Sequence, residues 1–310
     1  MSSSLTSLRI QIPARPVVRS LCTAAYNASG NPPTLLIPPD LVFLDLSTCG
    51  VLDYELDTLL VYFTSLQHII LDGCAILRRD LHDGECRALG KRCALVGVRR
   101  AREREKTLKS WLESKIIPDT TEDDSVGTGE NGPARVAKPG RKGLSTPTIS
   151  FRTPSTSSAT LPESTLSTPT AIPKKIIPKI RILPPMPCLL SLSVTVPASI
   201  KTEDYPIIRV EFESGWAEGI AQLGVTRTRM RTSAGNGVRV MQLVNKNRSG
   251  DSDKEEEGLE GLVDIDKDDP DAFEADSGLQ APVLCFAGAN DDGDHQSNCG
   301  HVIGRKMITS

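Results

Sequence analysis

Sulfur and imidazole side chains gather near the C-terminus, where Cys285, His295, Cys299 and His301 follow the spacing Cys-x9-His-x3-Cys-x-His. Thiolates and imidazoles are the side chains that most often bind zinc in proteins. Zinc fingers usually present these ligands in closely spaced pairs, and only Cys299 and His301 are that close here. The spacing therefore predicts neither a metal site nor a bound cofactor for this chain.

Catalytic residues do not occur in a recognisable arrangement. The four histidines stand at positions 68, 82, 295 and 301, and none belongs to a Ser/His/Asp or Cys/His motif in its required context. A glycine-rich phosphate-binding loop is not recognisable either. We therefore expect a chain that is not an enzyme.

Alternating arginines suggest a second kind of chemistry, the binding of anions. Residues 225–232 and 238–244 alternate like strands, and Asn236-Gly237 between them is a turn signal, so the pattern predicts a β-hairpin. One side of that hairpin would carry a cluster of guanidinium groups that suits phosphate or an acidic peptide. The candidate anion-binding residues are Arg227, Arg229, Arg231 and Arg239.

A basic segment over residues 85–117 holds ten Lys or Arg against four Asp or Glu and contains no proline. Its composition predicts a long basic helix over residues 85–114. Lys91-Arg92 and Arg99-Arg100 could contact phosphates, which would make the chain a nuclear nucleic-acid or chromatin factor. Interleaved glutamates favour the alternative, a solvated helix that covers the end of a repeat array.

Regular secondary structure must position any of these side chains. Two stretches of the chain share one pattern, Leu-x-x-Leu-x-Leu-x-x-Cys, at an offset of 25 residues. The pattern positions are Leu41, Leu44, Leu46 and Cys49 in the first stretch and Leu66, Ile69, Leu71 and Cys74 in the second. Between them, Asp53 starts a stretch with helical spacing of apolar residues. Residues 5–12 and 189–196 repeat the strand half of the pattern. Both cysteines are expected to be buried and structural.

This pattern resembles the leucine-rich repeat, and its cysteines resemble the variety found in substrate receptors of the F-box type. The resemblance implies an α/β fold: a short irregular leucine-rich-repeat solenoid with parallel strands and helices, interrupted and followed by long disordered segments. It also implies a non-enzymatic protein–protein interaction scaffold, in the manner of a substrate-receptor adaptor. An F-box itself is not recognisable before Leu41.

Side chains that alternate with the repeat leucines should lie on the opposite, concave face of the strands. We call this set the strand face; it comprises Phe43, Asp45, Ser47, His68, Ile70 and Asp72. Stacking of the two strands predicts three neighbouring pairs across it, 43 with 68, 45 with 70, and 47 with 72. Since solenoids commonly bind partners there, we expect the strand face to be exposed and to bind an unidentified protein.

Composition divides the chain into four segments. They are a repeat block ending in the basic helix (1–117), a disordered Ser/Thr/Pro-rich linker (118–175), a continuation of the repeats with the hairpin (176–247) and a disordered acidic tail (248–310). Residues 249–278 of this tail hold thirteen Asp or Glu against two Lys. The acidic run is the nearest candidate ligand for the arginines of the hairpin.

Cysteine usage and hydropathy set expectations about the compartment. The eight cysteines lack the dense spacing of a disulfide scaffold, which favours a reducing environment. Neither a secretory signal nor an apolar run of membrane-spanning length is evident. We therefore expect a protein of the cytoplasm or nucleus that does not bind membranes.

Overall fold

The computed structural model describes residues 5–22, 24–25, 34–35, 40–77, 84–116, 179–244, 259, 261–265, 271–274, 278–286 and 295–309. The predicted linker at 118–175 lies outside these residues, as does most of the acidic run at 249–278. Among the described helices, none combines the length and the apolar character that crossing a membrane requires.

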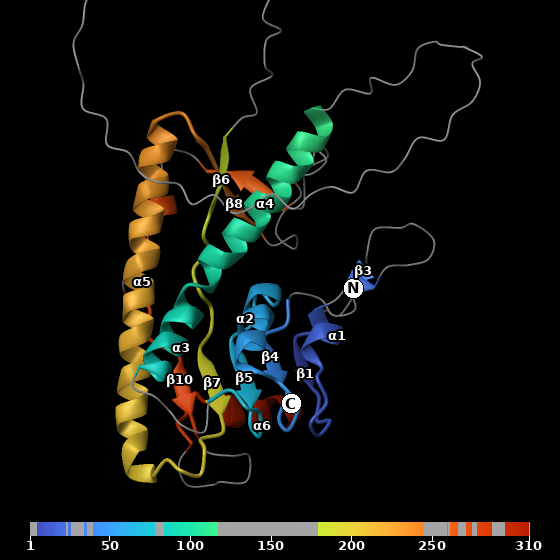
Figure 1. Ribbon diagram of the computed structural model, residues 1–310, viewed down its shortest axis with the longest axis vertical. Coiled ribbons are helices and arrows are strands. Elements are labelled where there is room, and N and C mark those ends of the chain that lie inside the picture. Colours follow the sequence, from blue (N-terminus) through green and yellow to red (C-terminus); the bar gives the residue numbers. More distant parts are fainter. Residues whose placement is uncertain are drawn as a thin grey trace, which may run out of the picture. The chain divides into compact units, whose positions relative to one another are not determined.

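A five-stranded parallel sheet lies at the centre of a mixed α/β fold (Figure 1). Its strands, in spatial order, are β1 (Ser7–Arg9), β4 (Phe43–Asp45), β5 (His68–Leu71), β7 (Ser191–Val194) and β10 (Val283–Cys285). Each neighbouring pair runs parallel. The α/β class and the strands expected within residues 5–12 and 189–196 are therefore confirmed. Strand β10 falls in the tail that composition predicted to be disordered, and there the prediction is wrong.

The register of β4 and β5 follows the offset of the sequence pattern. Phe43 pairs with His68 and Asp45 pairs with Ile70, as the repeat predicted. The amide of Thr48 then donates to the carbonyl of Asp72 at 2.6 Å, which continues the same alignment toward Ser47. The two segments that share the apolar pattern thus lie side by side, and equivalent positions of the pattern are neighbours across the two strands.

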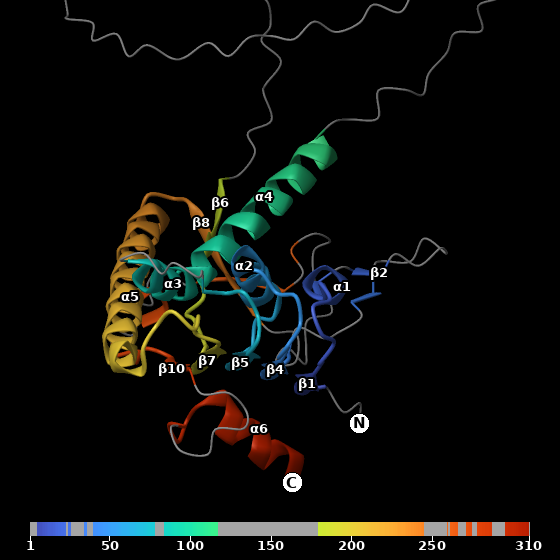
Figure 2. The ribbon, with the colours of Figure 1, turned by 60° about the horizontal axis from the view of Figure 1, so that its bottom comes forward.

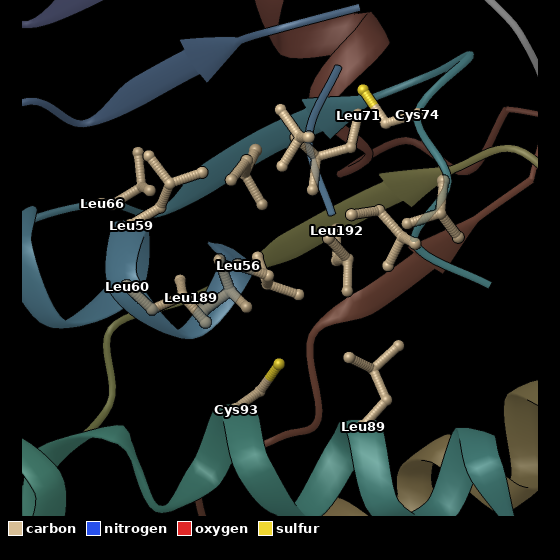
Figure 3. Close-up of a cluster of buried hydrophobic side chains, with 14 of the residues drawn as sticks. Leu56, Leu59, Leu60, Leu66, Leu71, Cys74, Leu89, Cys93, Leu189 and Leu192 are labelled. Atoms are coloured by element: carbon tan, nitrogen blue, oxygen red, sulfur yellow. The ribbon is translucent and has the colours of Figure 1, made fainter. Parts of the chain in front are cut away.

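The hydrophobic core lies on one face of this sheet, where several helices pack, among them α2 (Asp53–Tyr62) and α3 (Glu85–Ala94) (Figure 3). Leucines of α2, among them Leu56 and Leu59, point toward the leucines of the strands. Leu89 and Cys93 of α3 point into the same space. A parallel strand needs apolar cover, and the repeat leucines receive it here.

Cys49 and Cys74 occupy equivalent turns after β4 and β5. The Cys49 thiol donates to the carbonyl of Ile10 at 3.3 Å, and the Cys74 thiol donates to the carbonyl of Cys49 at 3.1 Å. Each cysteine thereby ties its turn to the preceding unit. Burial raises the pKa of Cys74 to about 11, which keeps the thiol protonated as this donor role requires. The structural role expected for both cysteines is confirmed.

A single helix of 31 residues, α5 (Tyr205–Gly235), replaces the hairpin predicted around Asn236-Gly237. Its buried stripe includes Phe212, Trp216 and Leu223, which recur with helical spacing. Arginines that alternate along the sequence favoured a strand, but the apolar period prevails. The hairpin and its strand over residues 225–232 are therefore wrong, and Asn236 is the residue at which the helix ends.

Helices α3 and α5 pack side by side at the distance of backbone contact (Figure 1). A Cβ atom added at Gly215 of α5 would lie 1.8 Å from the carbonyl oxygen of Arg87 in α3. A Cβ atom added at Gly90 of α3 would lie 2.1 Å from the carbonyl oxygen of Phe212. Only glycine permits this approach of the two backbones.

A second, smaller sheet joins β6 (Ile180–Leu183), β8 (Arg239–Leu243) and β9 (Leu262–Asp264) and packs on α4 (Val96–Ile116). The basic segment forms two helices, α3 and α4, with the break at Leu95, and so the single helix predicted there is wrong. The remaining short elements are α1 (Val18–Cys22), β2 (Ala24–Ala25), β3 (Thr34–Leu35), η1 (Thr202–Asp204) and η3 (Asp271–Phe273).

The contact between α3 and α5 predicts a large cost for one methyl group. Gly215→Ala should lower the free energy of unfolding by about 1–3 kcal/mol or more, because the added carbon overlaps a backbone carbonyl. Gly235→Ala is the matched control in the same helix, since nothing lies within 4 Å of its added Cβ. That variant should stay within about 0.5 kcal/mol of the native chain in urea unfolding. Equal stability of the two variants would contradict the packing.

Candidate functional site

The strand face is buried, which corrects the expectation that it is exposed. The exposed fraction is 2% for Phe43, 3% for Asp45, 6% for His68 and 1% for Ile70. Ser47 is buried as well. The six residues do lie together, since the register of β4 and β5 aligns them. The sequence patterns did not predict the second layer of structure that covers this face.

Helix α6 (Gly300–Thr309) supplies that layer (Figure 2). In Figure 2 it lies on the side of the strands opposite α2 and α3. Two glycines allow its close approach: a Cβ atom added at Gly304 would lie 2.7 Å from Phe43 Cζ, and one at Gly300 would lie 3.0 Å from Ile70 Cγ1. Residues 300–309 also belong to the tail predicted to be disordered, so that prediction is wrong for them.

Polar side chains of the strand face are bound by their neighbours. The Asp45 carboxylate accepts hydrogen bonds from the amide and hydroxyl of Ser47, at 3.0 and 2.6 Å, and forms an ion pair with Arg9 at 2.6 Å. His68 Nδ1 lies 2.8 Å from Ser191 Oγ on the adjacent strand. Burial lowers the pKa of His68, which favours its neutral form.

Asp72, which directly follows β5, links the sheet to α6 through a short contact. Its Oδ2 atom lies 2.6 Å from His301 Nε2. The exposed fractions of the two side chains are 13% for Asp72 and 3% for His301. A carboxylate accepts and never donates when ionised, so Nε2 of the imidazole carries the proton in this contact.

Four side chains whose spacing did not predict a metal site come together beside the contact of Asp72 with His301. We call them the Cys/His cluster: Cys285, His295, Cys299 and His301. Cys285 comes from β10, His301 from α6, and the other two from the segment that leads into α6. One donor atom of each lies within 4.8 Å of those of the others. This set is the group of described residues that could hold a metal ion. The spacing argued against a metal site because it is not that of a zinc finger, and it could not show that β10 and the segment before α6 come together.

Arginines of the predicted anion site do not share a face. Arg227 is buried in α5 and its guanidinium donates to the carbonyls of Pro184, Ala272 and Phe273. Arg239 pairs with Asp264 through two contacts of 2.7 Å. Arg229 and Arg231 are exposed on α5. The predicted grouping of these four arginines is therefore wrong.

Basic residues of α3 and α4 bind other parts of the chain. Arg92 forms a hydrogen bond of 2.9 Å with Asp53, and Arg99 forms one of 2.7 Å with Asp57. Arg100 is buried and donates to carbonyls at the C-terminal end of α2, among them those of Val61 and Phe63 at 3.0 and 3.1 Å. These cations stabilise the fold through groups of the same chain. They are therefore less suited to binding phosphate.

Comparison with known proteins returns nothing for this chain: no family model, no curated protein and no solved structure matches it. The chemistry of the strand face and of the Cys/His cluster is therefore argued from their geometry.

Neutral, buried His68 predicts a loss of stability in acid. The imidazole has a lower pKa in the folded chain than the ordinary 6.5, so the unfolded chain binds the proton more readily. Its contribution is complete above about pH 6.5 and is lost as the pH falls through the folded pKa, by up to about 1.4 kcal/mol per pH unit. Urea unfolding between pH 7.5 and 5 should therefore show a steeper fall for the native chain than for His68→Gln. Parallel curves would show that His68 does not titrate in this way.

Proposed function

We propose that this chain is a non-catalytic protein-binding scaffold of the leucine-rich-repeat type, with the strand face as its recognition surface. Support comes from the parallel register of β4 and β5 at a 25-residue offset and from the equivalent cysteines in their turns. The strand face offers an aromatic ring, an imidazole and carboxylates on a rigid sheet. The resemblance to substrate receptors extends the proposal to an adaptor that presents its bound partner.

The observation that carries this proposal is the seating of α6 on the strand face. Phe43 and Ile70 contact the helix where it carries glycine, at positions 304 and 300. These glycines are four apart, so they share one face of the helix. The strand face therefore suits a helix whose contacting side carries small residues, and the docking of a helix on an apolar surface is a known mode of protein recognition.

Helix α6 would then occupy, within the same chain, the surface that a partner would bind. A partner helix with small residues four apart competes with α6 for Phe43 and Ile70. Because α6 belongs to the same chain, it has a high effective concentration and shields the face until a partner displaces it. Binding is favoured over proton transfer because Asp45, Ser47 and His68 already bond to one another or to Arg9 and Ser191.

A labelled peptide of residues 295–310 tests the proposal on the full-length chain. Gly304→Leu in the chain drives its own α6 away from Phe43, at a cost of about 1–3 kcal/mol. The peptide should therefore bind this variant about 5- to 150-fold more tightly than the native chain, as measured by fluorescence anisotropy. A second peptide with Gly304→Leu should not bind.

Gly235→Leu is the control chain, since its side chain meets open space at the end of α5. It should bind the native peptide no better than the native chain does. Circular dichroism confirms that both variant chains remain folded. Equal binding of the peptide to all three chains, or no binding to the folded Gly304→Leu chain, would contradict the strand face as a helix-binding surface.

A further inference from the structure

We propose that the Cys/His cluster binds one zinc ion through the Sγ atoms of Cys285 and Cys299 and the Nδ1 atoms of His295 and His301. The four donor atoms lie within 4.8 Å of one another and come from separate parts of the C-terminal region. Two thiolates and two imidazoles are a ligand set typical of structural zinc. The proposal does not rest on the function proposed for the strand face, because its four ligands lie outside that face and only Asp72 belongs to both.

Three sulfur–nitrogen distances among the donors match those around one tetrahedral ion. Zinc bonds of about 2.3 Å to sulfur and 2.0–2.1 Å to nitrogen place the sulfur and nitrogen atoms about 3.6 Å apart. His295 Nδ1 lies 3.5 Å from Cys299 Sγ and 3.6 Å from Cys285 Sγ. His301 Nδ1 lies 3.7 Å from Cys285 Sγ. Both rings thus approach one sulfur, whereas a thiol has a single proton to donate to one of them.

The contact with Asp72 places the proton of the His301 imidazole on Nε2. The Nδ1 atom is then unprotonated, as zinc binding requires. Because Nε2 donates to the Asp72 carboxylate at 2.6 Å, the Nδ1 atom keeps its lone pair, and it lies 3.7 Å from Cys285 Sγ and 3.5 Å from Ser193 Oγ. A carboxylate that binds the outer nitrogen of an imidazole ligand is the common partner of zinc-bound histidine. Asp72 is therefore a positioning residue, and the burial of its contact with His301 strengthens this effect.

The ligand set points to zinc in a closed, structural site. Sulfur and imidazole donors exclude calcium and magnesium, which require oxygen. Four protein ligands leave no open position for water, in contrast to a catalytic zinc site. Cys285, Cys299 and His301 are buried, as a structural site requires. The ion would join β10 to α6 and, through Asp72, to the end of β5, and would so hold α6 on the sheet.

Metal analysis of the full-length chain tests the site. Chain purified with reductant and zinc, then dialysed against metal-free buffer, should retain one zinc per chain by mass spectrometry of the metal. X-ray absorption should show two sulfur atoms at about 2.3 Å and two nitrogen atoms at about 2.0 Å. Cys299→Ser should lose the zinc. Cys188→Ser is the matched control and should keep it, since its thiol donates to the carbonyls of Thr64 and Leu66 away from the cluster.

Asp72→Asn and Asp72→Glu test the site without removing a ligand. Competition with a chromophoric chelator should show zinc affinity about 10- to 100-fold lower for Asp72→Asn, with partial recovery for Asp72→Glu. Native affinity in Asp72→Asn would overturn the role given to Asp72. The zinc site itself is overturned if the native chain retains no zinc, if its spectrum lacks sulfur ligands, or if Cys299→Ser retains as much zinc as the native chain.

Discussion

Both faces of one parallel sheet have to be covered, and this requirement organises the rest of the structure. Parallel strands are stable when protein packs on each side of them, because neither face is suited to water. On one side the repeat leucines meet α2 and α3. On the other side the strand face meets α6, which comes from the far end of the chain. The N-terminal repeat and the C-terminal helix therefore complete one structural unit.

Local patterns in the sequence predicted these strands because the apolar spacing that lets a strand cover a core is visible within a few residues. The offset between Leu41 and Leu66 was enough to pair Phe43 with His68, since side chains alternate with period two. Burial of the strand face depends on α6, which is far away in the sequence, so no local pattern predicts it. Asp45 and His68 looked like exposed residues by type, but their bonds to Arg9 and Ser191 permit their burial.

The mistaken predictions about the arginines share a cause, which is that residue type was given more weight than the period of the apolar residues. In α5 the residues Phe212, Trp216 and Leu223 recur with helical spacing, whereas the alternating arginines farther along the helix suggested a hairpin. Arg100 and Arg227 also looked like ligands for anions. Both are buried guanidinium groups that satisfy backbone carbonyls, which leaves them no role in binding phosphate. The Cys/His cluster was set aside because its spacing is not that of a zinc finger, and spacing cannot show that the fold brings Cys285 of β10 to the other three residues.

The position of α6 on the strand face is the central claim, and hydroxyl-radical oxidation of two phenylalanines tests it most directly. Phe43 lies under α6, whereas Phe63 lies in the core between the sheet and its helices, with exposed fractions of 2% and 0%. If α6 covers the face, both rings in the native chain should be oxidised at the same slow rate, far below that of the unfolded chain. Slow oxidation of Phe63 with rapid oxidation of Phe43 would contradict the account.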